Sequence, residues 1–282
     1  MGVERAAALI CAWLATYFIH STLLLGVTWV STRRLPSRFD SLSELIWRGA
    51  LVLPIVTALT QSVFPSIRLL EPANVGGIEY SPQPLAIMHV PSWVWIGGAT
   101  LWLLGALAGL GQLIACHRRL RRQIADRTTL PGEVWRVISP LIARDDVRVS
   151  VVHDLAIPFA LMREICLPSW LPDRMSHAEL RAVVAHELSH VRRRDAFWRI
   201  ATAAVRRAFF FQPLNWVAVT RLRELSECIC DDEAIAAISS PVPLASALER
   251  VASRAITDRA RLTLAPAMGG GGGAPVSFTV KR

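Results

Sequence analysis

Charged residues are scarce in this chain, and over long stretches they are absent. Only 19% of the 282 residues are charged, whereas 52% are hydrophobic, a balance too apolar for an ordinary soluble protein. Residues 6–30 carry no charge and are long enough to span a bilayer, and the ranges 45–64 and 93–115 are also strongly apolar. The sequence therefore predicts a transmembrane region at residues 1–116, with three helices at about 6–30, 45–64 and 93–115.

A small-residue cleavage site is missing after the first apolar stretch, where the sequence reads STRRLPSR. The stretch is also longer than the apolar core of a signal peptide. We therefore expect the first helix to stay attached as a membrane anchor.

Arginine is scarce in one of the predicted loops and abundant in the others. Residues 65–91 contain Arg68 as their one basic residue, together with Glu71 and Glu79. Arginines cluster after the first and third predicted helices, at Arg33, Arg34, Arg38, Arg118, Arg119, Arg121 and Arg122. Because arginine-rich loops stay in the cytoplasm, the N-terminus is expected outside and everything after residue 117 inside. The net charge of +9 then reflects topology and attraction to anionic lipid, with no need for nucleic acid.

Cysteine and tyrosine are also few. The five cysteines suggest no disulfide framework, since Cys228 and Cys230 stand two apart on a predicted helix, where a mutual bridge is sterically disfavoured. We expect both to be small buried groups in a reducing compartment. The two tyrosines, Tyr17 and Tyr80, lie outside the predicted cytoplasmic part. An oxyanion-stabilising group would have to come from another side chain, and His153, His177 and Arg223 are unranked candidates.

The cytoplasmic part contains the motif HELSH at residues 186–190. Ser176 and Glu179 precede it with the spacing of a capping box, which predicts a helix. On a helix, His186 and His190 share a face and can bind one metal ion, while Glu187 lies beside the ion's open position as a general base. This is the H-E-x-x-H pattern of zinc hydrolases. The alternative is a surface helix on which two histidines and an acid coincide.

A third metal ligand is expected from the later predicted helix at residues 221–237. Glu227 and Asp231 stand four apart on one face, so Glu227 can complete a His, His, Glu zinc site while Asp231 orients an imidazole. Asp195 lies five residues after His190, about 140° round a straight helix, so we do not expect it to orient either histidine directly. We expect Asp195 to support the site by bracing the helix end against neighbouring arginines.

The remaining cytoplasmic elements predict a small α+β domain at residues 117–260. A helix is expected at 131–144, a strand at 147–152, and a hairpin within 157–171 whose edge could bind an extended peptide or be purely structural. Residues 196–220 are apolar enough for a fourth span, but they contain Arg199, Arg206 and Arg207, each costly in hydrocarbon. We expect them to form two helices joined near Gln212 and Pro213, packed on this domain and lying in the membrane interface. The Gly-rich residues 261–282 are expected to be a flexible tail.

Together these segments resemble the BlaR/MecR family of membrane zinc peptidases, the fifty-sixth family of metallopeptidases. The resemblance covers most of the chain and rests on the membrane helices ahead of HELSHVRRRD, and on the segments IPFALMREICLPSWL, FFFQPLNW and ECICD. It implies a mainly α fold, with N-terminal transmembrane helices and a cytoplasmic gluzincin-like α+β zinc peptidase domain. His186, His190 and Glu227 match the family's zinc ligands, and Glu187 matches its general base.

The resemblance also implies a role in signalling at the bacterial inner membrane, where an outside stimulus activates cleavage of a cytoplasmic repressor of the BlaI/MecI type. Family receptors for β-lactams continue into an extracellular penicillin-binding sensor, whereas this sequence ends at Arg282. We therefore expect no direct antibiotic binding, and a stimulus that arrives through a separate sensor partner or the outer loop.

Two other functions are compatible with the same residues. A housekeeping membrane protease resembling the HtpX or Ste-type enzymes has a similar zinc motif and would cut a broad set of membrane proteins. A non-enzymatic transducer would use the site as structural zinc, and its signalling would survive loss of Glu187.

Overall fold

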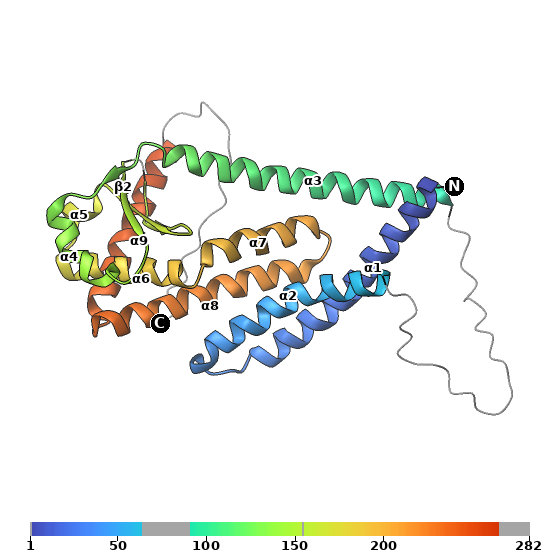
Figure 1. Ribbon diagram of the computed structural model, residues 1–282, viewed down its shortest axis with the longest axis horizontal. Coiled ribbons are helices and arrows are strands. Elements are labelled where there is room, and N and C mark those ends of the chain that lie inside the picture. The colour runs from blue at the N-terminus through green and yellow to red at the C-terminus, as the bar shows by residue number, and fades with distance from the viewer. Residues whose placement is uncertain (1, 64–90, 154, 265–282) are drawn as a thin grey trace. The chain divides into compact units, whose positions relative to one another are not determined.

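The computed structural model describes residues 2–63, 91–153 and 155–264 (Figure 1). The fold is mainly α, as the sequence predicts. The helices are α1 (Gly2–Thr32), α2 (Asp40–Val63), α3 (Ser92–Gln123), α4 (Gly132–Ile142), α5 (Leu171–Arg174), α6 (His177–Arg192), α7 (Asp195–Ala208), α8 (Pro213–Ile238) and α9 (Val242–Leu264). The strands are β1 (Thr128–Thr129), β2 (Arg148–Val152), β3 (Phe159–Ala160) and β4 (Glu164–Pro168). A short 3-10 helix, Ser37–Phe39, precedes α2.

Two sequence predictions concern residues outside these ranges. The outer loop used to orient the chain lies almost wholly within residues 64–90, and most of the Gly-rich tail lies beyond residue 264. Helix α9 itself reaches Leu264, past the residue at which the sequence predicts that the tail begins.

The chain divides into two compact units. The first comprises the residues up to Leu113 together with Thr202–Leu222, and the second comprises Ile114–Ala201 together with the residues from Arg223 onward. Residues 202–222, which the sequence analysis assigns to the peptidase domain, thus group with the apolar N-terminal helices. Helices α7 and α8 each contribute residues to both units.

The first unit contains helices that are long and apolar enough to cross a membrane. In the described residues three segments meet these criteria, Gly2–Thr32, Ser37–Thr60 and Ser92–Gln123. Most of their side chains face outward, as expected when lipid rather than protein covers them. Helices α1 and α2 are joined by polar contacts at two levels, His20 with Thr57 at 2.9 Å and Trp47 with Thr32 at 3.1 Å. The protein is therefore a membrane protein.

The second unit is built around a four-stranded sheet with the order β1-β2-β4-β3. Strands β2 and β4 are parallel, and the two edge strands pair antiparallel to them. The predicted strand, hairpin and preceding helix are confirmed at β2, β3–β4 and α4. Their apolar residues form one core with α6 and α9, in which Ile138, Ile165, Leu167 and Val184 are almost completely buried. Figure 1 shows the strands beside α6 and α9.

The predicted capping box of α6 is confirmed. The Ser176 hydroxyl accepts from the Glu179 backbone N–H, and the Glu179 carboxylate accepts from the Ser176 backbone N–H at 2.8 Å. Two of the free N–H groups at the helix start are thereby satisfied. The following residues, from Leu180 to Val191, are buried with one exception, so α6 is the central helix of this unit.

The chain changes direction at two points after the motif. Helix α6 ends at Arg192, and Arg194 adopts a left-handed conformation with φ of 56°, which ends one helix and lets α7 start in a new direction. The second point is the turn Phe209–Gln212, after which Pro213 opens α8. The predicted pair of helices joined near Gln212 and Pro213 is confirmed, but its turn packs on α1 rather than on the peptidase domain.

Candidate active site

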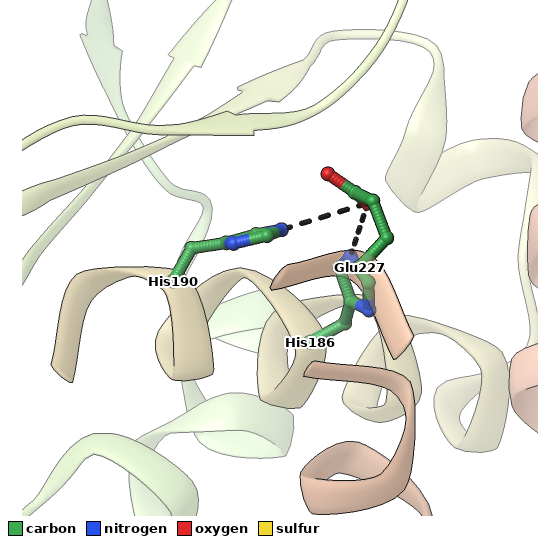
Figure 2. A group of neighbouring side chains, drawn as sticks. All are labelled: His186, His190 and Glu227. Atoms are coloured by element: carbon green, nitrogen blue, oxygen red, sulfur yellow. Dashed lines mark ion pairs between the residues drawn. The ribbon is translucent and has the colours of Figure 1, made fainter. Parts of the chain in front are cut away.

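Helices α6 and α8 bring three metal-ligating side chains together within the second unit. His186 and His190 lie one turn apart on α6, and Glu227 reaches toward both rings from α8 (Figure 2). Oε2 of Glu227 lies 3.6 Å from Nε2 of His186 and 3.8 Å from Nε2 of His190. The ligand atoms of all three side chains lie within 4.8 Å of one another.

These separations suit a metal ion better than direct hydrogen bonds. Hydrogen bonds between nitrogen and oxygen are about 2.7–3.2 Å long, shorter than either contact of Glu227 with a histidine. In tetrahedral zinc sites with bonds of about 2.0–2.2 Å, by contrast, neighbouring ligand atoms are about 3.3–3.5 Å apart. The donor set of two imidazoles and one carboxylate is that of a catalytic zinc site with a free fourth position. The residues present therefore fit a zinc ion.

The charges of the side chains at the site also favour a bound metal cation. Burial opposes the charged form of His186, but contacts with Asp231 and Glu227 outweigh it and raise its pKa to about 10. Burial also raises the pKa of Glu227, but the close contacts with the His186 and His190 rings outweigh it and keep that pKa below its ordinary value. The surrounding carboxylates thus hold positive charge on the imidazoles. A bound divalent cation would supply this positive charge in place of the imidazole protons. The deprotonated imidazole nitrogens could then bind the cation.

Glu187 lies directly beside these ligands and is 6% exposed. Burial raises its pKa, even though His186 and His190 oppose the shift. A carboxyl group with a raised pKa can take up a proton and pass it on, which is what a general base in hydrolysis must do. Glu187 is thus a buried acid, adjacent in sequence to one candidate ligand, whose charge interacts with His186, His190 and Glu227.

Asp195 orients His190, and the prediction that it could not do so was wrong. Nδ1 of His190 lies 2.8 Å from Oδ2 of Asp195. The same oxygen accepts a hydrogen bond of 2.7 Å from the Ser226 hydroxyl. Asp195 does not continue α6 as a straight helix, because the left-handed residue Arg194 separates it from α6 and turns it back toward the histidine. Burial raises the pKa of Asp195, but the hydrogen bonds from His190 and Ser226 outweigh it and lower that pKa to about 2.

The thiol of Cys230 lies on the same side of His190, with Sγ 3.2 Å from Nδ1. His190, Asp195 and Cys230 thus form a second group of ligating atoms in the described part of the chain. Burial raises the pKa of Cys230, so the thiol stays protonated and is a poor metal ligand. We interpret this group as support for the Nδ1 side of His190, which leaves Nε2 directed at Glu227.

Asp231 approaches the other histidine. Its Oδ1 lies 3.0 Å from Nδ1 of His186, one helical turn after Glu227, as the spacing on α8 suggests. The two atoms are close enough for an ion pair, although neither forms a hydrogen bond of good geometry. A small rotation of either side chain would complete the bond, so we treat the contact as an ion pair.

Arg199 is the functional candidate that sequence reasoning missed. Its guanidinium donates to Oε1 of Glu227 at 2.8 Å, whereas Oε2 of the same carboxylate faces the histidines. Arg199 lies four residues after Asp195 on α7, so the two project from one face of that helix. The spacing of Asp195 and Arg199 on one helix face could have suggested that both support the site. The sequence did not reveal that this face of α7 packs toward α8. Because Arg199 holds one carboxylate oxygen, it directs the other toward the metal position.

The other acidic residues of α8 do not join the cluster. Among the described residues, Glu224, Asp232 and Glu233 belong to neither group of metal-ligating atoms. The described cysteines are free thiols. Cys230 is buried as predicted, whereas the prediction that Cys228 is buried was wrong, because it is only partly covered on α8.

Comparison with known protein families gives one match. Residues 78–242 match the family model described as BlaR1 peptidase M56, which covers more than half of the chain and includes all the site residues described above. No curated protein matches the chain.

Proposed function

Because the chain belongs to the BlaR1 peptidase M56 family, we propose that it is a zinc-dependent endopeptidase in which His186, His190 and Glu227 hold the metal. Family membership and the three apolar helices make it a metallopeptidase of the membrane. The observation that carries the zinc assignment is the convergence of two Nε2 atoms and one carboxylate oxygen beside the buried Glu187.

A bound zinc ion would lower the pKa of a water molecule and polarise the scissile carbonyl group. Glu187 takes a proton from the attacking water and delivers it to the leaving amine as the carbon–nitrogen bond breaks. Asp195 accepts a hydrogen bond from Nδ1–H of His190 and thereby leaves Nε2 to face the metal. Asp231 pairs with the Nδ1 side of His186, and Arg199 holds Glu227 so that a single oxygen faces the histidines.

Substrate binding is proposed to use the free edge of β3. This strand lies at the end of the sheet and packs against α6, the helix that carries the motif. An extended peptide added there would be held by backbone hydrogen bonds, which depend little on its sequence.

In the cell we propose a signalling peptidase of the bacterial inner membrane. The arginine distribution supports a multi-pass topology with the N-terminus outside and the peptidase in the cytoplasm. The proposed substrate is a cytoplasmic transcriptional repressor, cut in response to a cell-wall or antibiotic stimulus that a separate sensor partner or the outer loop conveys. The match to the BlaR1 peptidase M56 family supports this proposal.

The test replaces Glu187 by Gln and compares new protein N-termini in cells that express either form at equal levels. We expect cleavage to fall by about 10²–10⁴-fold, because the proton acceptor is lost while the metal ligands remain. Zinc content of the purified variant should match that of the wild type. The matched control is Glu233→Gln, the same change at an exposed site on α8, which should cleave normally.

The pattern of cut proteins decides between functions. One repressor cut by the wild type alone supports the signalling role. Many cut membrane proteins would instead show a housekeeping protease, and identical N-termini with both chains under cell-wall stress would contradict an active peptidase.

A further inference from the structure

The helical hairpin formed by α7, the turn Phe209–Gln212 and α8 exposes large apolar side chains. Phe197, Ile200, Phe210 and Trp216 are each between 41 and 52% exposed. Water-facing helices do not gather aromatic residues in this way unless something apolar covers them. The question is what covers the hairpin.

The turn of the hairpin is bonded to α1, one of the membrane-spanning helices. The Gln212 amide donates to the Ser21 hydroxyl at 2.6 Å and to the Thr22 hydroxyl at 2.9 Å. The Asn215 amide donates to the Tyr17 hydroxyl at 3.0 Å. Phe209 stacks on the ring of Tyr17, with centroids 3.8 Å apart. Gln212, Asn215, Tyr17 and Ser21 are at most 1% exposed, so this is a built interface.

The level of these contacts on α1 fixes the depth of the turn. The uncharged run of α1 extends from Ala6 to Thr32, and its midpoint is Ile19. Tyr17 and Ser21 stand two residues to either side of that midpoint, or about 3 Å along the helix axis. If α1 spans the bilayer, the turn lies near the middle of the hydrocarbon core.

Helix α3 gives the same depth independently. The indole N–H of Trp102 donates to the backbone carbonyl of Ala208 at 2.9 Å. Gly105 lies against the ring of Phe210, and a Cβ at this position would be 2.5 Å from a ring carbon. Both residues are next to the centre of the predicted span at 93–115. Small residues allow this close approach between membrane helices.

From these contacts we propose that the α7–α8 hairpin is re-entrant: it enters the bilayer from the cytoplasmic side, turns at Phe209–Gln212 and returns. The cover of Phe210 and Trp216, which belong to the same unit as α1 and the apolar part of α3, is lipid hydrocarbon. The arginines near the turn are accommodated by the protein, since the Arg206 guanidinium lies 4.4 Å from the ring centroid of Trp216 and Arg207 donates to the Ala203 carbonyl at 3.4 Å.

The test labels the wild-type chain in vesicles of phosphatidylethanolamine and phosphatidylglycerol that contain a phospholipid with a diazirine at the end of an acyl chain. After illumination, mass spectrometry locates the carbene adducts. Trp216 and Trp135 form a matched pair, 52 and 46% exposed, the second on α4 in the peptidase unit. We expect at least tenfold more labelling on the peptide carrying Trp216, at a level similar to the peptide carrying Leu103 of α3.

Equal, low labelling of the Trp216 and Trp135 peptides, with Leu103 labelled, would overturn the re-entrant hairpin. The experiment requires neither zinc nor catalysis, so Glu187→Gln should give the same labelling. An inactive protein with a labelled hairpin would contradict the proposed function alone, and an active protein with an unlabelled hairpin would contradict this inference alone.

Discussion

In the part of the chain that the structure describes, one cluster of polar side chains in each compact unit can be compared, and the two differ in the kind of group they contain. The metal-site cluster consists of the buried His186, Glu187 and His190 and the partly buried Glu227, and it is titratable throughout. The turn cluster of Tyr17, Ser21, Gln212 and Asn215 consists of neutral hydroxyl and amide groups. Side chains of the first belong to a soluble-type α+β unit, and those of the second to helices that suit a membrane.

The difference shows what each cluster is for. In the turn cluster the amide groups of Gln212 and Asn215 find hydrogen-bond partners on α1, which is what burial of a neutral polar group requires. In the metal-site cluster the gaps of 3.6 and 3.8 Å remain between ligand atoms, and Nδ1 of His186 has no hydrogen bond of good geometry. A satisfied neutral cluster joins helices, whereas a charged cluster with gaps is built to hold an ion.

The largest expected effect comes from removing a candidate ligand. Zinc at a thousandfold excess over its Kd should stabilise the wild-type chain by about 4 kcal/mol, and His190→Ala should abolish this gain because the site loses a ligand. The free energy of unfolding in detergent micelles, with and without zinc, measures the effect. His177→Ala, an exposed histidine at the start of the same helix, is the control and should retain it. If zinc stabilised His190→Ala as much as the wild type, the ion would bind elsewhere.

A smaller effect is expected from Asp195→Asn. The change removes the charge that orients His190 but no ligand, and substitutions around metal ligands typically cost about 10–100-fold in affinity. Competition with a chelator measures the zinc Kd directly. Asp232→Asn, the same change at an exposed position of α8, should leave the Kd unaltered. An unchanged Kd in Asp195→Asn would mean that the contact with His190 does not support the site.

These residues also show how far the sequence leads. The helix around His186, Glu187 and His190 could be predicted because its cap, its apolar face and its ligand spacing are all local. Glu227 and Asp231 could be predicted because they share one helix. The contact of Asp195 could not, because it depends on one left-handed residue that breaks the helix at Arg194. Arg199 was missed because its role exists only once α7 faces α8.

The same limit applies to the turn cluster. A glutamine and an asparagine beside a proline are typical of a helix connection, and Tyr17 within an apolar helix is typical of helix packing. Their partnership joins residues nearly two hundred positions apart in the chain. Local patterns carry no information about such a pairing, so the sequence predicted both helices of the hairpin but not where their turn docks.

The smallest effect is expected from Gln212→Leu, which tests whether the two clusters are independent. Leucine keeps the approximate volume of the side chain and removes its hydrogen bonds to Ser21 and Thr22. Hydrogen bonds between membrane helices average about 0.6 kcal/mol and reach about 1.7 kcal/mol, so we expect a loss of about 1 kcal/mol in the free energy of unfolding. Gln123→Leu, at an exposed position ending α3, should change it far less.

The zinc Kd of Gln212→Leu carries the second half of that test. Gln212 precedes Glu227 by 15 residues along the chain, and the turn cluster contains no ligand or supporting residue of the metal site. If its role is to join helices, the Kd of the variant should stay within about twofold of the wild type, since distant sites without shared partners act independently. A tenfold rise in Kd would show that the turn on α1 and the carboxylate of Glu227 are coupled through α8. The two clusters would then not be independent, and the contacts of the turn with α1 would influence the affinity of the metal site.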